Sequence, residues 1–408
     1  MTGPGNGGAR RDFLRGAVVS GATGLLAGGL TGAAAASEAA SPSPATTATT
    51  PPYHGRHQPG VVPEPRRHTV FVAFDVIADG RGELTDLMRT LTDRARVLAA
   101  GGPPRETGIS GPPADSGVLG PVPPRRAGPL ITVGVGASLF DDRYGLAARR
   151  PSALTTMTAF PNDTLDPKWC HGDLSLQLSA DDEDTVLHAL RDIARHTRGA
   201  MQVRWRMSGF VSPPRPSGTP RNLLGFKDGT ANPGRDDLDR LVWLGGAGPL
   251  GGGTYLAVRL IRMLVEFWDR IGITEQEQLI GRSRDSGAPL DGTRESDAPH
   301  YARDPVGKLI PLTSHIRRAN PRTPQTERHR ILRRSFNYDL GTDASGNLDM
   351  GLLFTCYQRD LRTQFETVQH RLKDEPLVDY ITPFGGGYFL VLPGVRDAAD
   401  HLGRALLT

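Results

Sequence analysis

The stretch DLSLQLSADDEDTVLHALRDIARHTRGAMQVRWRMSGF, residues 173–210, contains three consecutive structural signals. Its first eight residues alternate polar and apolar side chains, which is typical of a strand. An amphipathic stretch follows that opens with acidic residues and ends at Gly199, as a capped helix does. The closing MQVRWRMSGF has the composition of another strand. The stretch therefore predicts strand, helix and strand.

The residues before this stretch extend the pattern. HTVFVAFDV at 68–76 is rich in β-branched and aromatic residues and predicts a strand. Apolar residues at helical spacing predict a helix over 82–99, and PLITVGVGASL at 129–139 predicts a buried strand. The order strand, helix, strand, strand, helix, strand over residues 68–210 is that of the ferredoxin-like, or split βαβ, unit.

The same order recurs, less regularly, in the second half of the chain. Strands are predicted for TYLAVRLIRM, ILRRSFNYD, GLLFTCYQRD and GYFLVLPG, and helices for LVEFWDRIG and LRTQFETVQHRL. We therefore expect an α+β protein of two ferredoxin-like modules, residues 66–215 and 216–408. Residues 282–330, rich in charge, Gly and Pro, interrupt the second module. Segments of that length inside a domain are usually functional or disordered.

The N-terminus has the pattern of an export signal. Residues 10–14 read RRDFL, a mildly apolar Gly/Ala run follows, and Ala34-Ala35-Ala36 precedes Ser37. Together these features predict a cleavable twin-arginine signal over residues 1–36. The run is too rich in glycine for an anchor, so we expect no stable membrane span after cleavage and a periplasmic or extracellular protein. Residues 37–65, rich in Ser, Pro, Ala and Thr, are expected to be a disordered tether.

Composition limits the classes of function. Residues 1–36 carry three arginines and one aspartate, so their removal lowers the formal net charge from +4 to +2. A net charge this small does not indicate a nucleic-acid-binding protein. Cys170 and Cys356 are the two cysteines, and nothing in the sequence decides whether they pair. Cys170-His171 does not form the Cys-x-x-Cys-His motif, which excludes covalent c-type haem attachment. No Cys/His cluster supports a structural zinc.

Candidate functional residues lie in the second module. His315 lies in the polar segment TSHIRRANPR, with a proline on either side of the histidine in the sequence. Its imidazole could be a metal ligand or a solvated side chain. Asp228, in LGFKDGTANP, could cap its own Asp-Gly turn or take part in chemistry, whereas the ligand pattern of a calcium loop is missing. Arg333 and Arg334 are neighbours on a predicted strand, so one of them must point inward.

Four segments in order, GFKDGTANP, HIRRANPR, ILRRSFNYD and PFGGGYFLVLPG, resemble those of dye-decolourising (DyP-type) haem peroxidases, in particular the twin-arginine-exported branch that includes iron-uptake-linked, deferrochelatase-like members. The resemblance covers the chain from about residue 66 onward. It implies two ferredoxin-like modules in a dimeric α+β, barrel-like arrangement, with one non-covalent haem b in the C-terminal module. It also implies that His315 is the proximal iron ligand, that Asp228 and Arg333 are the distal catalytic residues, and that Asp379 is the carboxylate behind His315.

By this resemblance the expected function is a haem-dependent peroxidase that reduces hydrogen peroxide and oxidises aromatic, dye-like or other one-electron donors, metal ions included. Asp228 would serve as the acid–base group and Arg333 would stabilise developing negative charge. A haem- or iron-handling protein of an uptake system, deferrochelatase-like, is the alternative. A non-catalytic exported binding module, in which Asp228 merely caps a turn, is a third. A homo-oligomer is possible on this reading.

Overall fold

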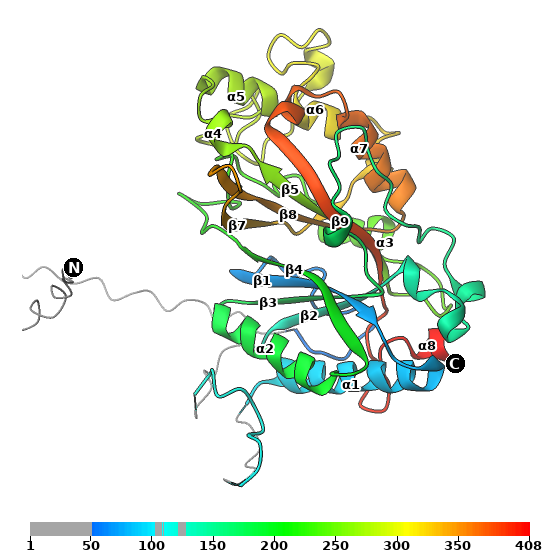
Figure 1. Cartoon of the computed structure of the whole chain (residues 1–408). Helices are drawn as coiled ribbons and strands as arrows, with labels where there is room; N and C mark the ends of the chain where they lie inside the picture. The colour runs from blue at the N-terminus through cyan, green and yellow to red at the C-terminus, as the bar shows by residue number, and fades with distance from the viewer. Residues whose placement is uncertain (1–50, 103–107, 109, 121–127) are drawn as a thin grey trace, which may run out of the picture. The chain divides into compact units, whose positions relative to one another are not determined.

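Both predicted modules are present in the computed structural model, which describes residues 51–102, 108, 110–120 and 128–408 (Figure 1). The elements of the first module are β1 (His68–Val76), α1 (Gly80–Ala100), β2 (Leu130–Gly136), β3 (Leu174–Ala180), α2 (Glu183–His196) and β4 (Met201–Phe210). The order of strands in its half of the sheet is β2-β3-β1-β4. This is the predicted ferredoxin-like topology.

The second module repeats this topology, with strand order β9-β5-β8-β7. Its strands are β5 (Thr254–Met263), β6 (Leu332–Arg333), β7 (Phe336–Thr342), β8 (Leu348–Gln358) and β9 (Ile381–Val391). The α-helices that follow β4 are α3 (Leu238–Leu241), α4 (Val265–Trp268), α5 (Ile273–Ile280), α6 (His315–Ala319), α7 (Thr367–Leu372) and α8 (Arg404–Leu407).

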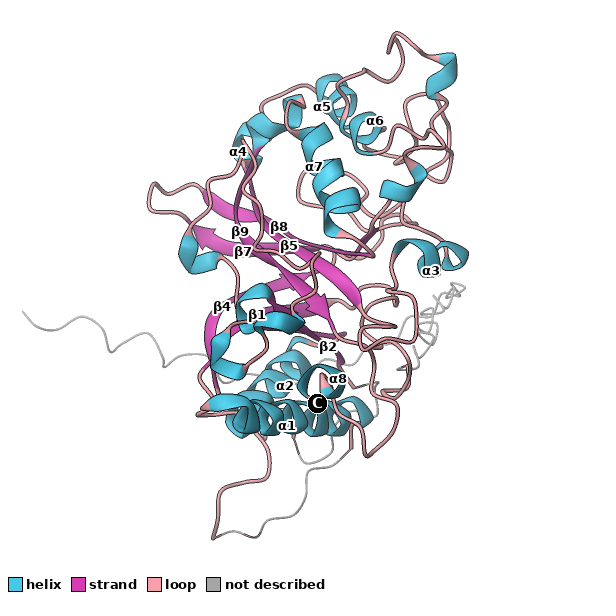
Figure 2. Ribbon diagram, turned by 90° about the vertical axis from the view of Figure 1, so that its right-hand side faces the viewer, coloured by secondary structure: helices cyan, strands magenta, loops and turns pink. Residues whose placement is uncertain are grey.

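The two halves join into one closed sheet. Strand β2 pairs with β9, β4 pairs with β7, and β5 pairs with both β8 and β9, so the strands form a ring with antiparallel pairing throughout. Helices α1 and α2 cover the outer face of the first half, and α4 to α7 lie over the second half (Figures 1 and 2). The predicted barrel-like α+β arrangement is confirmed.

The interior of the barrel is filled by alternate residues of the strands. Leu256, Val258 and Leu260 of β5 pack with Phe71 of β1 and Phe389 of β9, each at most 1% exposed. The intervening residues of β5 face outward, because side chains alternate between the two faces of a strand. The outward face of the second half is therefore available to build a site beneath α6 and α7.

Two predicted elements of the second module are interrupted. The strand predicted for ILRRSFNYD divides into β6 and β7 at Arg334 and Ser335, although both parts pair with β8. The helix predicted for residues 361–372 begins as a π-helical segment, Leu361–Glu366, before α7. Such irregular turns occur often at functional sites.

Residues 51–65 are not the expected tether. Val61 is fully buried, and Gln58 is 5% exposed. The Gln58 side chain donates to the backbone oxygens of Val133 (2.7 Å) and Leu392 (3.0 Å) and accepts from the Val133 amide (2.7 Å). A composition argument counts apolar area and misses such specific hydrogen bonds, so the prediction was wrong for residues 51–65. Residues 1–36, the predicted export signal, and residues 37–50 lie outside the described residues.

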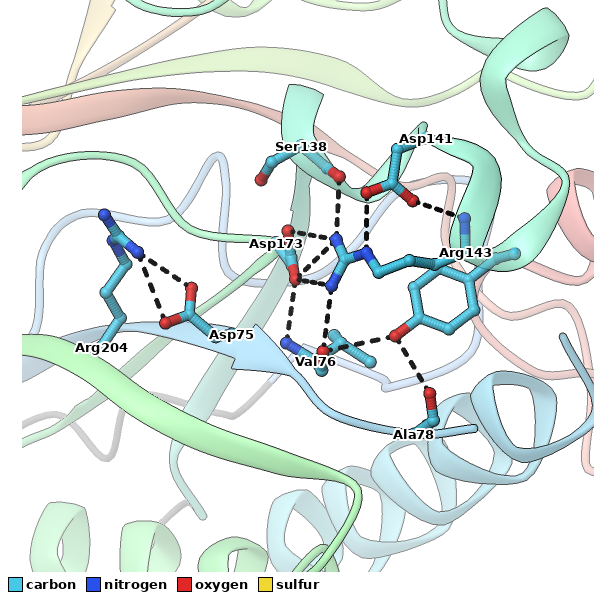
Figure 3. A network of polar contacts seen from close by, with 9 residues as sticks. Asp75, Val76, Ala78, Ser138, Asp141, Arg143, Asp173 and Arg204 are labelled. Atoms are coloured by element: carbon cyan, nitrogen blue, oxygen red, sulfur yellow. Dashed lines mark hydrogen bonds and ion pairs between the residues drawn. The ribbon is translucent and has the colours of Figure 1, made fainter. Parts of the chain in front are cut away.

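A polar network fixes the edge of the first module (Figure 3). The guanidinium of Arg143 contacts the carboxylate of Asp173 at 3.1 Å and donates to the backbone oxygens of Val76 (3.1 Å) and Ser138 (3.0 Å). Asp173 is 4% exposed and also accepts from the Val76 amide at 3.0 Å. The network joins the ends of β1, β2 and β3, and none of its residues lines the cavity described next. Among the described residues, no helix has the length and apolar character of a membrane span.

Candidate functional site

A cavity of about 230 Å³ lies on the outward face of β5 and β8, beneath α6 and α7. Apolar side chains from these elements and from the π-helical segment before α7 form much of its wall, and they include Ile261, Ile316, Leu352, Phe354, Phe365 and Leu372. His315, Asp228 and Arg333, predicted from distant parts of the sequence, all line this one cavity. The fold therefore brings these three candidates together.

His315 is the first residue of α6 and is held by a carboxylate. Its Nδ1 donates to Glu375, at 2.8 Å from Oε2 and 3.1 Å from Oε1. Glu375 is 3% exposed, whereas the His315 side chain is 27% exposed and lines the cavity. Burial lowers the pKa of His315, but the charge and hydrogen bond of Glu375 outweigh burial and raise it. With Nδ1 engaged, Nε2 is the atom that remains for a ligand role.

Glu375, and not the predicted Asp379, is the carboxylate behind His315. Glu375 directly precedes the 3₁₀ turn Pro376–Tyr380 and projects into the interior, whereas Asp379 lies within the turn and is exposed. Asp374 is exposed as well. Leu377 and Tyr380 are buried, and their packing orients the turn. The prediction of Asp379 was wrong because nothing local distinguishes three neighbouring carboxylates.

Asp228 and Arg333 form an ion pair, with 3.1 Å between Asp228 Oδ1 and Arg333 Nη2. The turn that carries Asp228 is anchored by Leu224 and Phe226, which are 4% and 2% exposed. Trp268 Nε1 donates to the Leu224 backbone oxygen at 3.0 Å. These anchors fix the backbone on one side of Asp228, so its carboxylate is aimed at the cavity rather than free to cap its own turn.

Asn232, at the end of the same turn, binds the backbone of Arg333. Its Nδ2 donates to the Arg333 oxygen at 3.0 Å, and the Arg333 amide donates to Asn232 Oδ1 at 2.9 Å. Arg334 points the other way, toward the backbone oxygen of Val62, and its side chain is 8% exposed. The two neighbouring arginines therefore diverge as predicted. The role of Asn232 was not predicted, since Asn-Pro is an ordinary turn dipeptide.

A second cavity, of about 530 Å³, adjoins the first. Both cavities are lined by Asp228, Thr230 and Arg333. The wall of the second cavity also includes Glu64 and Ser335. The Asp228–Arg333 pair thus borders two spaces, one shared with His315 and one that extends toward residues 64 and 65.

The residues present fit haem. Among the described residues, no group of three or more His, Cys, Asp or Glu side chains is arranged to hold a metal ion. A single imidazole backed by a carboxylate instead suits an iron that a macrocycle already holds. The apolar walls suit the flat ring, and arginine side chains that line the cavity suit its carboxylates; they include Arg282, Arg322, Arg330 and Arg333. The buried Tyr301 hydroxyl, also in this wall, has no hydrogen-bond partner among the described residues.

Both cysteines are unsuited to thiolate chemistry. Cys170 and Cys356 are buried and unpaired. Cys356 Sγ donates to Gln358 Oε1 at 3.1 Å, and Cys170 Sγ donates to the Asp166 backbone oxygen at 3.3 Å. Burial raises the pKa of both thiols. Because the thiolate is the reactive form, redox chemistry at a cysteine is disfavoured here and the His315 cavity is the better candidate site.

The fold and the cavity define an α+β protein of two ferredoxin-like modules, in which one cavity is lined by a histidine that contacts a buried carboxylate and by a carboxylate–guanidinium pair. Residues 58–211 match the N-terminal model of the Dyp-type peroxidases, and residues 219–396 match the C-terminal model. The chain belongs to the Dyp-type peroxidase family.

Relatives support this membership over most of the chain. Deferrochelatase of Shigella flexneri serotype 5b (strain 8401) and that of Escherichia coli (strain K12) are each 48% identical, over 87% of this chain and 87% of theirs. DtpA from Streptomyces lividans is similar in structure, with TM-score 0.80 and 36% identity over 89% of this chain and 98% of its own. The DyP-type peroxidase from Cellulomonas bogoriensis has a TM-score of 0.78 and 37% sequence identity, over 88% of this chain and 98% of its own.

Family membership confirms several predictions made from the sequence. The chain is an enzyme, a peroxidase, with haem as its cofactor. Hydrogen peroxide and an electron donor are its substrates at the level of the family.

Proposed function

We propose that His315 holds the haem iron through Nε2 and that Asp228 and Arg333 act on hydrogen peroxide in the same cavity. The observation that carries this assignment is the pair of contacts described above: His315 Nδ1 lies 2.8 Å from Glu375, and Asp228 lies 3.1 Å from Arg333. Haem, when bound, supplies an iron that peroxide can oxidise and that one-electron donors can reduce again.

The chain's own residues supply proton transfer and charge. Asp228 Oδ1 faces Arg333, so Oδ2 is the atom that takes a proton from one peroxide oxygen and returns it to the other, which leaves as water. Arg333 stays protonated throughout and stabilises the negative charge that develops as the O–O bond breaks. Glu375 keeps the His315 ring in one orientation and one tautomer.

Stopped-flow spectra of the haem-loaded protein mixed with peroxide test these roles. Haem of the b type should be extractable into acidified organic solvent, since no covalent attachment is expected. His315→Ala should lose the spectrum of a histidine-ligated haem. Asp228→Asn and Arg333→Leu should keep that spectrum and react more slowly with peroxide. Unchanged peroxide rates in both variants would remove the pair from the mechanism.

A second candidate function is iron removal from haem, favoured by the 48% identity to deferrochelatases. The same cavity would then bind haem and release iron while the porphyrin stays intact. Porphyrin fluorescence and free iron, measured together after the protein is incubated with haem and a reductant, decide this. Intact porphyrin that appears with released iron supports the second function, whereas dye or phenol oxidation without free porphyrin supports the first.

The cell compartment is also a proposal. The Arg10-Arg11 pattern supports export by the twin-arginine route to the periplasm or the exterior. Arg10→Lys combined with Arg11→Lys should keep the protein in the cytoplasm, as cell fractionation would detect. Normal export of this variant would contradict the proposed route.

A further inference from the structure

A second ion pair lies beside Asp228 and is nearly enclosed. Lys227 Nζ is 2.5 Å from Glu295 Oε2, and the two side chains are 4% and 17% exposed. Lys227 precedes Asp228 in the turn, whereas Glu295 belongs to the long segment 282–330 that later supplies His315. The contact therefore fastens the segment that carries the proposed iron ligand to the turn that carries the proposed acid–base residue.

Glu295 also binds the two arms of that turn. Its Oε1 accepts from the Thr219 amide at 3.1 Å, from Thr219 Oγ1 at 2.5 Å and from Thr230 Oγ1 at 3.1 Å. Thr219 precedes the turn and Thr230 follows Asp228 in it. The Asp228 amide in turn donates to the Pro220 oxygen at 2.9 Å. One carboxylate thus closes the base of the loop from which Asp228 projects.

The backbone leaves room for this contact on both sides. Gly218 has φ +82°, and a Cβ there would lie 2.0 Å from Glu295 Oε2. Gly287 has φ +74°, and a Cβ there would lie 2.6 Å from Lys227 Cδ. Both positions need glycine for their backbone conformation and for the close approach. Glycines in two separate segments of the chain therefore leave the space that the Lys227–Glu295 ion pair occupies.

Stability alone gives a poor account of this arrangement. A buried ion pair often contributes no more than well-packed apolar side chains would, because both charges must leave water. A carboxylate that receives bonds from an ammonium, an amide and two hydroxyls does, however, define one geometry. Such a geometry has a purpose where a neighbouring carboxylate must be held in place, as Asp228 must be beside Arg333.

We propose that Glu295 is a positioning residue for Asp228, acting through Lys227, Thr219 and Thr230. This inference rests on the proposed function, in which Asp228 moves the peroxide proton. Glu295 touches neither peroxide nor haem in this role. It fixes the loop so that the Asp228 carboxylate stays within reach of Arg333 and of the cavity, because small displacements of a proton-transfer group slow the reaction strongly.

The test compares Glu295→Gln, which keeps the shape and removes the charge, with Asp228→Asn as the reference. Asp192→Asn is the matched control, because Asp192 is another buried carboxylate, 4% exposed and paired with Arg94, in the first module. In the haem-loaded protein, Glu295→Gln should bind haem normally and lower the peroxide rate constant by up to about 100-fold, the size of effect that a misplacement of about 1 Å has on a reacting group. Asp192→Asn should leave that rate constant unchanged.

Hydrogen exchange in the haem-free protein gives a readout that does not depend on activity. In Glu295→Gln the amides of Thr219 and Asp228 should exchange faster, while amides of β1 should keep their protection. Faster exchange everywhere, as general destabilisation gives, would overturn the inference. Thr219→Val, which removes only one of the bonds to Glu295, should give a smaller change in the same two amides, and it serves if Glu295→Gln does not fold.

The variants distinguish the positioning role of Glu295 from the proposed role of Asp228. A slow Asp228→Asn together with a Glu295→Gln as fast as the wild type would overturn the positioning role and leave the proposed function standing. An Asp228→Asn as fast as the wild type would overturn both, because Asp228 would have no function to be positioned for. Slow reaction in both variants, with local exchange confined to the turn, is the expected result.

Discussion

The side-chain amide of Asn232 pairs with both backbone groups of Arg333, at 3.0 Å to its oxygen and 2.9 Å from its nitrogen. Asn232 thereby continues the short strand β6 on its free side. The turn that carries Asp228 and the strand that carries Arg333 are joined at this point. The relative position of Asp228 and Arg333 therefore depends on the hydrogen bonds between the Asn232 side chain and the Arg333 backbone.

Asn232→Ala should weaken both stability and catalysis. Both backbone groups of Arg333 lose a partner, which costs about 1–3 kcal/mol of unfolding free energy if they stay away from water. The peroxide rate constant should fall because the guanidinium is no longer held beside Asp228. Urea unfolding and stopped-flow rates measure the two effects. Asn347→Ala, in an exposed hairpin turn, should change neither; equal behaviour of the two variants would contradict the role of Asn232.

The contact between His315 and Glu375 predicts a shift in the haem potential. An ionised carboxylate at Nδ1 makes the imidazole more electron-rich and stabilises the oxidised iron. Glu375→Gln should therefore bind haem, raise the ferric/ferrous midpoint potential and slow the peroxide reaction by roughly 10- to 100-fold. Spectroelectrochemistry measures the potential.

Asp379→Asn is the matched control for Glu375→Gln. Asp379 is close in sequence but exposed, so its variant should behave as the wild type. A midpoint potential that moves equally in both variants would mean that the contact at Nδ1 does not tune the iron.

The strands could be predicted because each has a pattern of its own. TYLAVRLIRM and MQVRWRMSGF coincide with β5 and β4, since composition and alternation suffice where a strand is regular. The break at Arg334 could not be predicted, because it depends on how β6 and β7 share β8. The π-helical start of the segment before α7 has no sequence signal either.

The site was predictable only in part for the same reason. His315, Asp228 and Arg333 were identified by the order of four motifs. Glu375 and Asn232 become recognisable only when segments distant in sequence meet. Whether Glu375 or Asp379 faces His315 depends on the direction of one 3₁₀ turn, which packing determines. Gln58, in the segment 51–65, donates hydrogen bonds to Val133 of β2 and to Leu392 directly after β9, and composition does not report such contacts.

The buried pair of Arg259 and Asp163 predicts a large effect on the stability of the fold. Their side chains are 2% and 3% exposed, and Arg259 also lies over the Phe160 ring at 5.3 Å. Asp163→Asn leaves a buried guanidinium without its counter-charge, so the unfolding free energy should fall by about 3–5 kcal/mol. Asp86→Asn, which breaks an exposed pair with Arg89, should cost less than about 1 kcal/mol.

A double variant separates the pair from its surroundings. Arg259→Met combined with Asp163→Asn removes both charges, so it should lose less than the sum of the two single changes. Urea unfolding of the haem-free protein gives all three values. Additive losses would indicate that the two side chains contribute independently.

Glu295 predicts a pH dependence of stability. Burial raises its pKa, but the hydrogen bonds from Lys227, Thr219 and Thr230 outweigh burial and lower it from 4.5 to about 2. The carboxylate is thus more acidic in the folded than in the unfolded protein. Its contribution, roughly 3 kcal/mol by linkage, is complete above about pH 4.5 and is lost as the pH falls toward about 2.

Unfolding free energies of the wild type and Glu295→Gln, measured at a series of pH values, isolate this contribution from that of other carboxylates. The difference between the two proteins should be constant from neutral pH to about pH 5 and should shrink steadily between about pH 4.5 and pH 2, where the wild type takes up the proton that glutamine never binds. A difference that persists unchanged down to pH 2 would show that the glutamine variant loses stability through altered packing rather than through the charge of Glu295.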